Sequence, residues 1–426
     1  MPLDDERPES FLGLLMGLEG VADGYTILHG PTGCKYYPAS ASEAAYRCRT
    51  GSAESRNVFR FGDEYFFGQP RIPCTYLDMG KFVTGGADRL KDVYAKIRGM
   101  SPSLISVVNS PGASLIGEDL AVLKGDIPTV AVDHARYSGT AAEGFQDAVG
   151  AITDVVVPEQ GERHGVNLVG LSILHLGWKD TAADLTHLLS LCGIEVNCVI
   201  GAGWSVEDIR RSADAELNAL VHPEWGEDTA KGYEDRFGVP YVASPEGAPV
   251  GFDSLEGWVE CVCDALGKDP SPALGKIADG RGRAASAMLA MESAHLLPRG
   301  RTFSVLADGS TAYALSRFLY SYLGMVPVAV RCPNGKEWGG RAVEYFDSLG
   351  IPVGDDPENT GADVILSSAS IGSSAVSRGV AQGSVDVEAP GLSFVHVDPC
   401  PGIGLGGTAR IVDGVLNVIA NRQRFR

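Results

Sequence analysis

Short apolar runs rich in β-branched residues alternate with amphipathic helical segments along most of the chain, and this alternation limits it to few folds. In the first third, strands are expected at residues 24–30, 103–110 and 127–133, and helices at about 115–124 and 138–155. Buried runs that alternate with helices are typical of parallel sheets covered by helices on both faces. The pattern therefore predicts an α/β fold.

The same alternation begins again twice further along the chain. After a polar, turn-rich segment at 157–165, strands are expected at 167–175, 195–201, 219–223 and 239–242. A mainly helical stretch at 254–298 leads into a third series, with strands at 302–308, 326–332, 363–368 and 392–398. Three such series predict three Rossmann-like domains with mostly parallel sheets, at residues 1–158, 159–300 and 301–426.

The composition excludes several classes of protein. A net charge of −19 repels phosphate backbones, so we expect no nucleic-acid partner. No apolar stretch approaches the roughly 20 residues that cross a bilayer, so we expect no membrane association. The start of the chain lacks the basic and apolar regions of a secretory signal, which predicts a cytoplasmic protein. Nine cysteines in such a protein do not indicate a disulfide framework.

The turn His29-Gly30-Pro31-Thr32-Gly33-Cys34, directly after the first expected strand, is the sharpest local motif. Gly30 and Gly33 allow the backbone to approach a bulky group closely. A thiolate at the tip of such a turn is well placed to bind a soft metal or a cluster. A plain strand-to-helix turn with an incidental cysteine explains the spacing equally well.

Two further segments carry candidate chemistry. Cys74 stands between a proline-containing loop and a Thr-Gly-Gly turn at 84–86, and taken alone it is better explained as a structural cysteine. The segment 110–120 is a strand end that runs into a helix, for which Ser114 is a candidate cap. There is no Walker A lysine motif, so this chain is not expected to hydrolyse ATP itself.

Taken together and in this order, the motifs resemble those of the nitrogenase component 1 superfamily. The matching segments are HGPTGC (29–34), CTYLDMGKFVTGGADRL (74–90), SLIGEDL (114–120), ALVHP (219–223), GYEDRFGVPYV (232–242) and HVDPCPGIGLGGTARIVD (396–413). The superfamily includes light-independent protochlorophyllide reductase and nickel-sirohydrochlorin a,c-diamide reductive cyclase. The resemblance implies subunits of three Rossmann-like domains that pair around an interfacial iron–sulfur cluster. It also implies a separate ATP-hydrolysing iron protein as the electron donor.

Departures from the family pattern narrow the expected function. Of the three cluster cysteines of nitrogenase subunits, only the middle one is clearly matched, by Cys34, while Pro111 occupies the place of the last. Nitrogenase holds its molybdenum cofactor on the cysteine of an LVHC motif, and the matching segment here ends in His222-Pro223. We therefore expect no molybdenum cofactor and no nitrogen fixation.

The resemblance implies Cys34 and Cys74 as cluster ligands. A 4Fe–4S cluster usually takes four thiolates, and two per chain across a twofold axis supply them, which favours a homodimer. A heterodimer with a related subunit and unequal ligand counts stays open. Cys48 and Asp78 are the alternatives for the second ligand.

The resemblance also places a small-molecule substrate between the domains. Candidate lining residues are His29, His222, His396 and Cys400, of which the histidines could donate protons; each also has an ordinary structural explanation. The expected function is a nitrogenase-like reductase that acts on an unsaturated substrate, with a tetrapyrrole as the leading guess. A non-catalytic scaffold or carrier for metallocluster assembly, or a plain binding module, are the alternatives.

Overall fold

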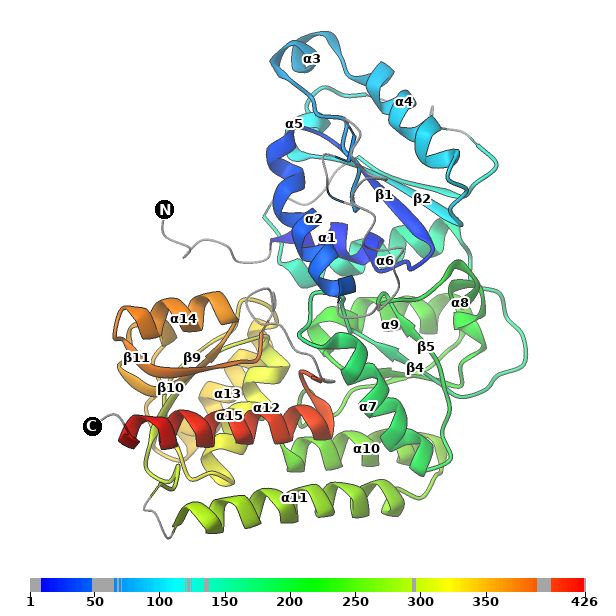
Figure 1. Cartoon of the computed structure of the whole chain (residues 1–426). Coiled ribbons are helices and arrows are strands. Elements are labelled where there is room, and N and C mark those ends of the chain that lie inside the picture. The colour runs from blue at the N-terminus through cyan, green and yellow to red at the C-terminus, as the bar shows by residue number, and fades with distance from the viewer. Residues whose placement is uncertain are drawn as a thin grey trace.

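The computed structural model describes residues 9–47, 65–66, 69, 71–118, 120, 123, 125–133, 138–292, 296–388 and 400–424. It contains three separate sheets in which every strand pairing is parallel, each flanked by helices. The expected α/β fold is thereby confirmed. In Figure 1 the first sheet lies above, and the other two lie side by side below it. None of the helices in these ranges is both long and apolar enough to cross a membrane.

The first sheet has the order β1-β2-β3, and its central strand is buried along its whole length. Its elements are α1 (Ser10–Glu19), β1 (Gly24–His29), α2 (Thr32–Arg47), α3 (Met79–Thr84), α4 (Ala87–Arg98), β2 (Leu104–Asn109), α5 (Pro111–Ser114), β3 (Thr129–Val132) and α6 (Ala141–Val155). Helix α1 packs closely on α6, since a Cβ on Gly13 would lie 1.9 Å from the carbonyl oxygen of Ala141. The expected strands of this series are all present.

The second sheet has the order β5-β4-β6-β7. Its elements are β4 (Val166–Val169), α7 (Trp178–Leu191), β5 (Val196–Ile200), α8 (Val206–Arg211), η5 (Ser212–Asp214), β6 (Leu217–Leu220), α9 (Pro223–Phe237), β7 (Tyr241–Val242), α10 (Phe252–Leu266) and α11 (Ser271–Glu292). Strand β4 is shorter than expected, because Gly170 takes φ +86° and the chain turns there.

The third sheet has the order β11-β10-β8-β9. Its elements are β8 (Thr302–Leu306), α12 (Gly309–Ser321), β9 (Val326–Arg331), α13 (Lys336–Ser348), η6 (Pro357–Asn359), β10 (Ala362–Ser367), α14 (Ala369–Ser377), β11 (Ala381–Asp386) and α15 (Gly404–Arg424). Helix α15 crosses to the middle part of the chain and contacts α7, α10 and α11 (Figure 1). The strand expected at 392–398 lies outside the described residues.

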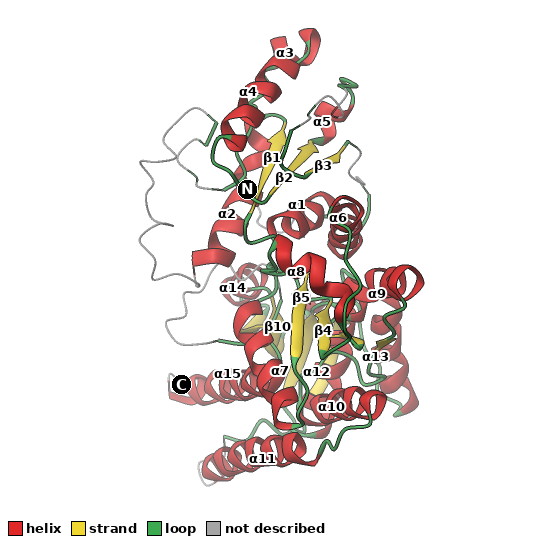
Figure 2. Cartoon of the chain, turned by 90° about the vertical axis from the view of Figure 1, so that its right-hand side faces the viewer, coloured by secondary structure: helices red, strands yellow, loops and turns green. Residues whose placement is uncertain are grey.

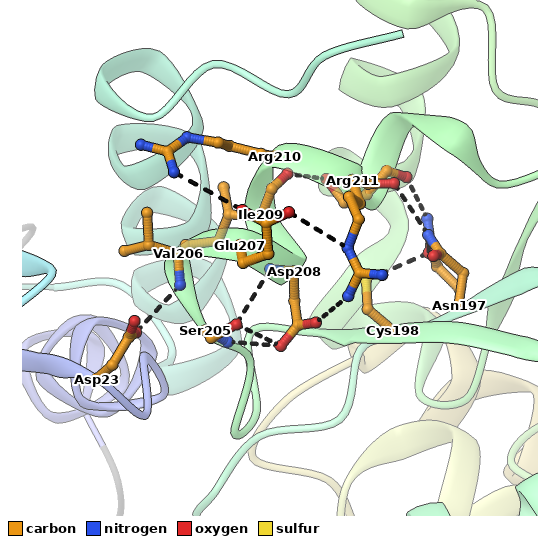
Figure 3. Close-up of polar contacts among 12 residues, drawn as sticks. Asp23, Asn197, Cys198, Ser205, Val206, Glu207, Asp208, Ile209, Arg210 and Arg211 are labelled. Atoms are coloured by element: carbon orange, nitrogen blue, oxygen red, sulfur yellow. Dashed lines mark hydrogen bonds and ion pairs between the residues drawn. The ribbon is translucent and has the colours of Figure 1, made fainter. Parts of the chain in front are cut away.

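The first sheet is joined to the second through the start of α8. Oδ1 of Asp23 accepts a hydrogen bond from the Val206 amide at 3.0 Å, and the Ala22 amide donates to the Trp204 carbonyl at 2.8 Å. At the start of α8, the capping residue Ser205 forms a capping box with Asp208 (Figure 3). Asp23 thus stands at the positive end of a capped helix, where a carboxylate is favoured. Figure 2 shows the first sheet standing over β4 and β5.

The α-helix expected at 115–124 is wrong over the described residues of that range, because α5 (Pro111–Ser114) ends before it begins. Helix α5 begins at Pro111, and its cap is Ser110, whose Oγ accepts from the Ala113 amide at 3.3 Å. The chain leaves the helix in a turn that includes Gly117 at φ +72°. Ser114 is not a cap, because its hydroxyl donates to the Asp133 carbonyl. Proline at the first helical position presets φ, and this moves the helix start upstream.

Candidate functional site

The cysteine turn lies at the carboxyl end of β1, where α2 begins. Cys34 is half-buried in the first turn of α2, and the Ser110 hydroxyl hydrogen-bonds to its thiol. A Cβ on Gly30 would lie 2.4 Å from Oγ of Ser110, so this glycine is required by the protein's own packing. A Cβ on Gly33 would meet nothing within 4 Å. Gly33 therefore leaves open space beside Cys34.

Cys74 lies next to this turn because its segment pairs with β1. The Leu28 amide donates to the Pro73 carbonyl at 2.9 Å, and the Thr75 amide donates to the Leu28 carbonyl at 3.1 Å. The Cys74 side chain is fully buried, and its thiol donates to the Gly30 carbonyl at 3.2 Å. Burial raises the pKa of the Cys74 thiol to about 11. The Cys74 thiol also lies 3.9 Å from the Pro31 carbonyl, which accepts the Cys34 amide at 3.2 Å, so Cys74 sits against the turn that carries Cys34.

Lys35 is a site residue that the sequence reasoning missed. It is 1% exposed, and its Nζ donates to the carbonyls of Arg71 and Ile72 at 3.0 and 2.9 Å. Lys35 therefore ties the start of α2 to the segment that leads into Cys74. Burial lowers the Lys35 pKa to about 8, and Cys74 is the strongest of the groups that oppose this shift. A buried ammonium beside thiols favours their ionised form.

His29 and Asp78 are engaged by their own neighbours. His29 is fully buried, and its Nε2 lies 2.7 Å from Oε2 of Glu118, another residue that the sequence reasoning missed. Burial lowers the pKa of His29 despite the raising effect of Glu118, which favours a neutral ring. Asp78 caps α3 by accepting from the Lys81 amide at 2.9 Å. Cys48, the other alternative ligand, lies outside the described residues.

A second polar region lies between the middle and C-terminal sheets, around His222. It encloses a cavity of about 20 Å³, enough for about one water molecule, with Leu171, His175, Leu176, Thr181, His222, Asp308, Thr311, Val387, Glu388, Gly402 and Ile403 in its wall. The His222 ring packs on that of His175 at 4.3 Å, and its Nδ1 lies 3.3 Å from Oγ1 of Thr311. Burial, and then His175, hold the pKa of His222 well below its usual value.

Asp308 contacts several polar side chains of this second region. Trp225 Nε1 donates to its Oδ2 at 2.5 Å, and Asn334 donates to its Oδ1. His175 accepts the Ser172 amide at Nδ1, so a neutral ring carries its proton on Nε2, which lies 3.4 Å from Oδ2 of Asp308. Burial and the charge of Asp308 raise the pKa of nearby Glu224 to about 8.

The structure brings some of the predicted residues together and separates others. Cys34 and Cys74 share one region, and His222 lies in the other. His29 belongs to the cysteine region and does not line the cavity, while His396 lies outside the described residues. Cys400 is buried beside α7, where its amide donates to Oδ2 of Asp180 at 2.8 Å.

Sequence position gave a usable signal for the missed cavity residues. His175 and Asp308 are the last residues of the strands expected at 167–175 and 302–308, and carboxyl ends of parallel strands are where ligands bind in open α/β sheets.

Comparison with known proteins gives one family. The model of the family "Nitrogenase component 1 type Oxidoreductase" matches residues 10–420. The B subunit of light-independent protochlorophyllide reductase from Synechococcus sp. (strain CC9605) is 30% identical over 240 residues, covering 53% of this chain and 43% of the relative. Its counterpart from Halorhodospira halophila (strain DSM 244 / SL1) is 28% identical over 232 residues, covering 52% of this chain and 42% of the relative. The aligned region therefore spans less than half the length of these relatives.

Solved structures share the fold. The structure titled "Nitrogenase Cp1 at pH 6.5" superposes with a TM-score of 0.77 at 17% identity, over 97% of this chain and 92% of that one. The structure titled "Nitrogenase Cp1 at pH 5" gives a TM-score of 0.71 at 16% identity, over 98% and 89% of the two chains. At this level of identity, the likeness establishes the three-sheet architecture alone.

Proposed function

Because the chain belongs to the nitrogenase component 1 type oxidoreductase family, we propose that it is the cluster-binding component of a two-component reductase. Cys34 and Cys74 would hold an iron–sulfur cluster, most simply one 4Fe–4S cluster shared by two chains. The cluster would supply single-electron transfer, and an ATP-hydrolysing iron protein would be the electron donor. The substrate would be an unsaturated molecule, with a tetrapyrrole as the leading candidate.

One observation carries the proposal: two thiols and a buried ammonium meet at the end of β1. The Cys74 thiol lies 3.9 Å from the Pro31 carbonyl that accepts the Cys34 amide, and Lys35 favours a thiolate at Cys74. Such a donor set suits a soft, anionic metal cluster better than a neutral ligand. Among the described residues, no three His, Cys, Asp or Glu side chains gather to hold a metal. The thiols of a second chain would complete the ligand shell.

The two cysteines differ in access. Cys34 is half-buried beside the open space at Gly33, so it can reach a cluster at an interface. Cys74 is sealed, and its sulfur would first have to give up its hydrogen bond to the Gly30 carbonyl. We therefore assign Cys34 as the principal ligand, with Cys74 behind it.

Exposed apolar side chains around this region support an interface. Tyr36 on α2 is 69% exposed, Met79 and Val83 on α3 are 82% and 84% exposed, and Leu115 after α5 is 88% exposed. Figure 1 shows α2, α3 and α5 in the same upper part of the molecule, and large apolar side chains left in water are typical of surfaces that bind a partner. A second copy of this chain or a related subunit would cover part of this surface, and the iron protein would dock close by.

The region around His222 is the proposed substrate site. Its histidines and Asp308 offer hydrogen-bond donors and acceptors at the carboxyl ends of strands from two sheets. We propose His222 as a proton-handling residue there, and His396 stays a prediction for the same site. His29 fits a role at the cluster better, since it contacts Glu118 and not the cavity.

The size of the cavity favours a second candidate function. The described residues enclose about 20 Å³ there, which admits a water molecule and no tetrapyrrole. A scaffold or carrier that holds a cluster for another protein needs no large substrate cavity. In both functions Cys34 would bind the cluster. A reductase would also reduce a substrate repeatedly, whereas a scaffold would only transfer the cluster.

Anaerobic preparation with ferrous iron and sulfide tests the proposal. The wild-type protein should bind iron and turn brown, and Cys34→Ser should lose most of the iron. Cys261→Ser is the matched control, because Cys261 is also half-buried but lies on α10, away from the cysteine turn. A Cys34→Ser protein with the iron content of the wild type would overturn the assignment. ATP-dependent substrate reduction with a purified iron protein supports the reductase, whereas cluster transfer without turnover supports the scaffold.

A further inference from the structure

Glu118 joins two segments that carry motifs of the cysteine region. Its Oε2 lies 2.7 Å from Nε2 of His29, and its Oε1 accepts a hydrogen bond from the Gly86 amide. The side chain of Glu118 is 10% exposed and that of His29 is fully buried, so little water competes for these bonds. One carboxylate thus ties the end of β1 to the turn between α3 and α4.

The backbone turn around this carboxylate is closely packed. A Cβ on Gly86 would lie 2.4 Å from Cδ2 of Leu77 and 3.1 Å from Cε1 of His29. Gly85 has a φ of +91°, and a Cβ there would lie 3.2 Å from Oε1 of Glu118. The two adjacent glycines therefore allow the turn to close directly on His29 and Glu118.

His29 is connected to both cysteines through the backbone of the turn that follows it. The next residue, Gly30, accepts the Cys74 thiol at 3.2 Å through its carbonyl and donates its amide to Oγ1 of Thr75 at 3.0 Å. The same turn continues into Cys34 at the start of α2. A shift of the His29 ring would therefore move the backbone that sets the spacing of the two thiols.

We propose that Glu118 is a positioning residue that fixes the geometry of Cys34 and Cys74 for metal binding by holding His29 and Gly86 at once. The inference rests on the proposed function, because it concerns the same cluster. Groups behind the direct ligands orient them, and their loss typically weakens metal affinity by roughly 10–100-fold. The role depends on the length and acceptor geometry of the side chain more than on its charge.

Two variants separate geometry from charge. Glu118→Asp keeps the charge but shortens the side chain, so that it cannot reach both partners. Glu118→Gln keeps the length and an acceptor for the Gly86 amide. We expect Glu118→Asp to bind iron roughly 10–100-fold more weakly than the wild type, and Glu118→Gln to bind it like the wild type. Glu227→Ala is the control, because Glu227 pairs with Lys231 on the surface of α9.

Iron affinity is measured by competition with a ferrous chelator after anaerobic reconstitution, and circular dichroism of the iron-free proteins reports folding. If Glu118→Asp binds iron like the wild type, or Glu118→Gln loses it as Glu118→Asp does, the positioning role is wrong. If the wild-type protein itself binds no iron, the proposed function fails and the inference falls with it. The two failures are therefore distinguished in a single experiment.

Discussion

Removing the indole N–H of Trp225 should destabilise the protein measurably. Trp225 is 1% exposed, and its Nε1 donates to Oδ2 of Asp308 at 2.5 Å. A hydrogen bond to a charged group contributes about 1.5–3 kcal/mol, and the carboxylate would stay buried without this donor. Trp225→Phe also leaves a small cavity, which adds roughly 1 kcal/mol. We expect its free energy of unfolding to fall by about 2–4 kcal/mol.

Trp204→Phe is the matched control. Trp204 is 2% exposed, but its Nε1 has no hydrogen-bond partner among the described residues. The two substitutions remove the same atoms, so the difference between them isolates the hydrogen bond to Asp308. Urea unfolding followed by circular dichroism gives both free energies. Equal losses of unfolding free energy in the two variants would show that the hydrogen bond from Trp225 to Asp308 does not stabilise the protein.

Three further predictions concern buried charges and glycines. The wild-type free energy of unfolding should rise by about 3 kcal/mol as pH rises from 8 to 10.5, because the Lys35 pKa is about 8 in the folded state and 10.5 in the unfolded state. Lys35→Met should abolish this rise, which urea titrations across this range measure. The wild-type free energy of unfolding should fall by up to about 5 kcal/mol as pH rises from 4.5 to 8, because the buried Glu224 carboxyl keeps its proton in the folded state, and Glu224→Gln should abolish this fall. Urea titrations across this range that show the same pH dependence for both proteins would contradict this. Gly30→Ala should cost about 1–3 kcal/mol because its Cβ meets Ser110, whereas Gly33→Ala should cost nothing; thermal melting compares them.

The fold was predictable because each strand and helix of an α/β fold leaves a pattern in a short, continuous stretch of sequence. Each strand of the first series shows an apolar, β-branched run in the sequence, and β1, β2 and β3 lie where those runs stand. Strand β11 was missed because its sequence, AQGSVD, is polar and small, and its pairing with β10 supplies what propensity does not. The three domain boundaries stay a prediction.

The candidate site was predictable only in part, because its contacts join distant segments. The motif around Cys34 was visible in the sequence, and the structure brings Cys74 beside it through pairing with β1. Lys35 looks like an ordinary charged residue of a helix until its burial is known. Asp308 and Trp225 stand 83 residues apart, and no spacing in the sequence indicates that they meet.

Native mass spectrometry of the anaerobically reconstituted protein measures directly whether two chains share one cluster. We expect a dimer that carries one 4Fe–4S cluster for two chains, and loss of the cluster in Cys34→Ser. An iron-free monomer, or a cluster that survives the Cys34→Ser substitution, would contradict it.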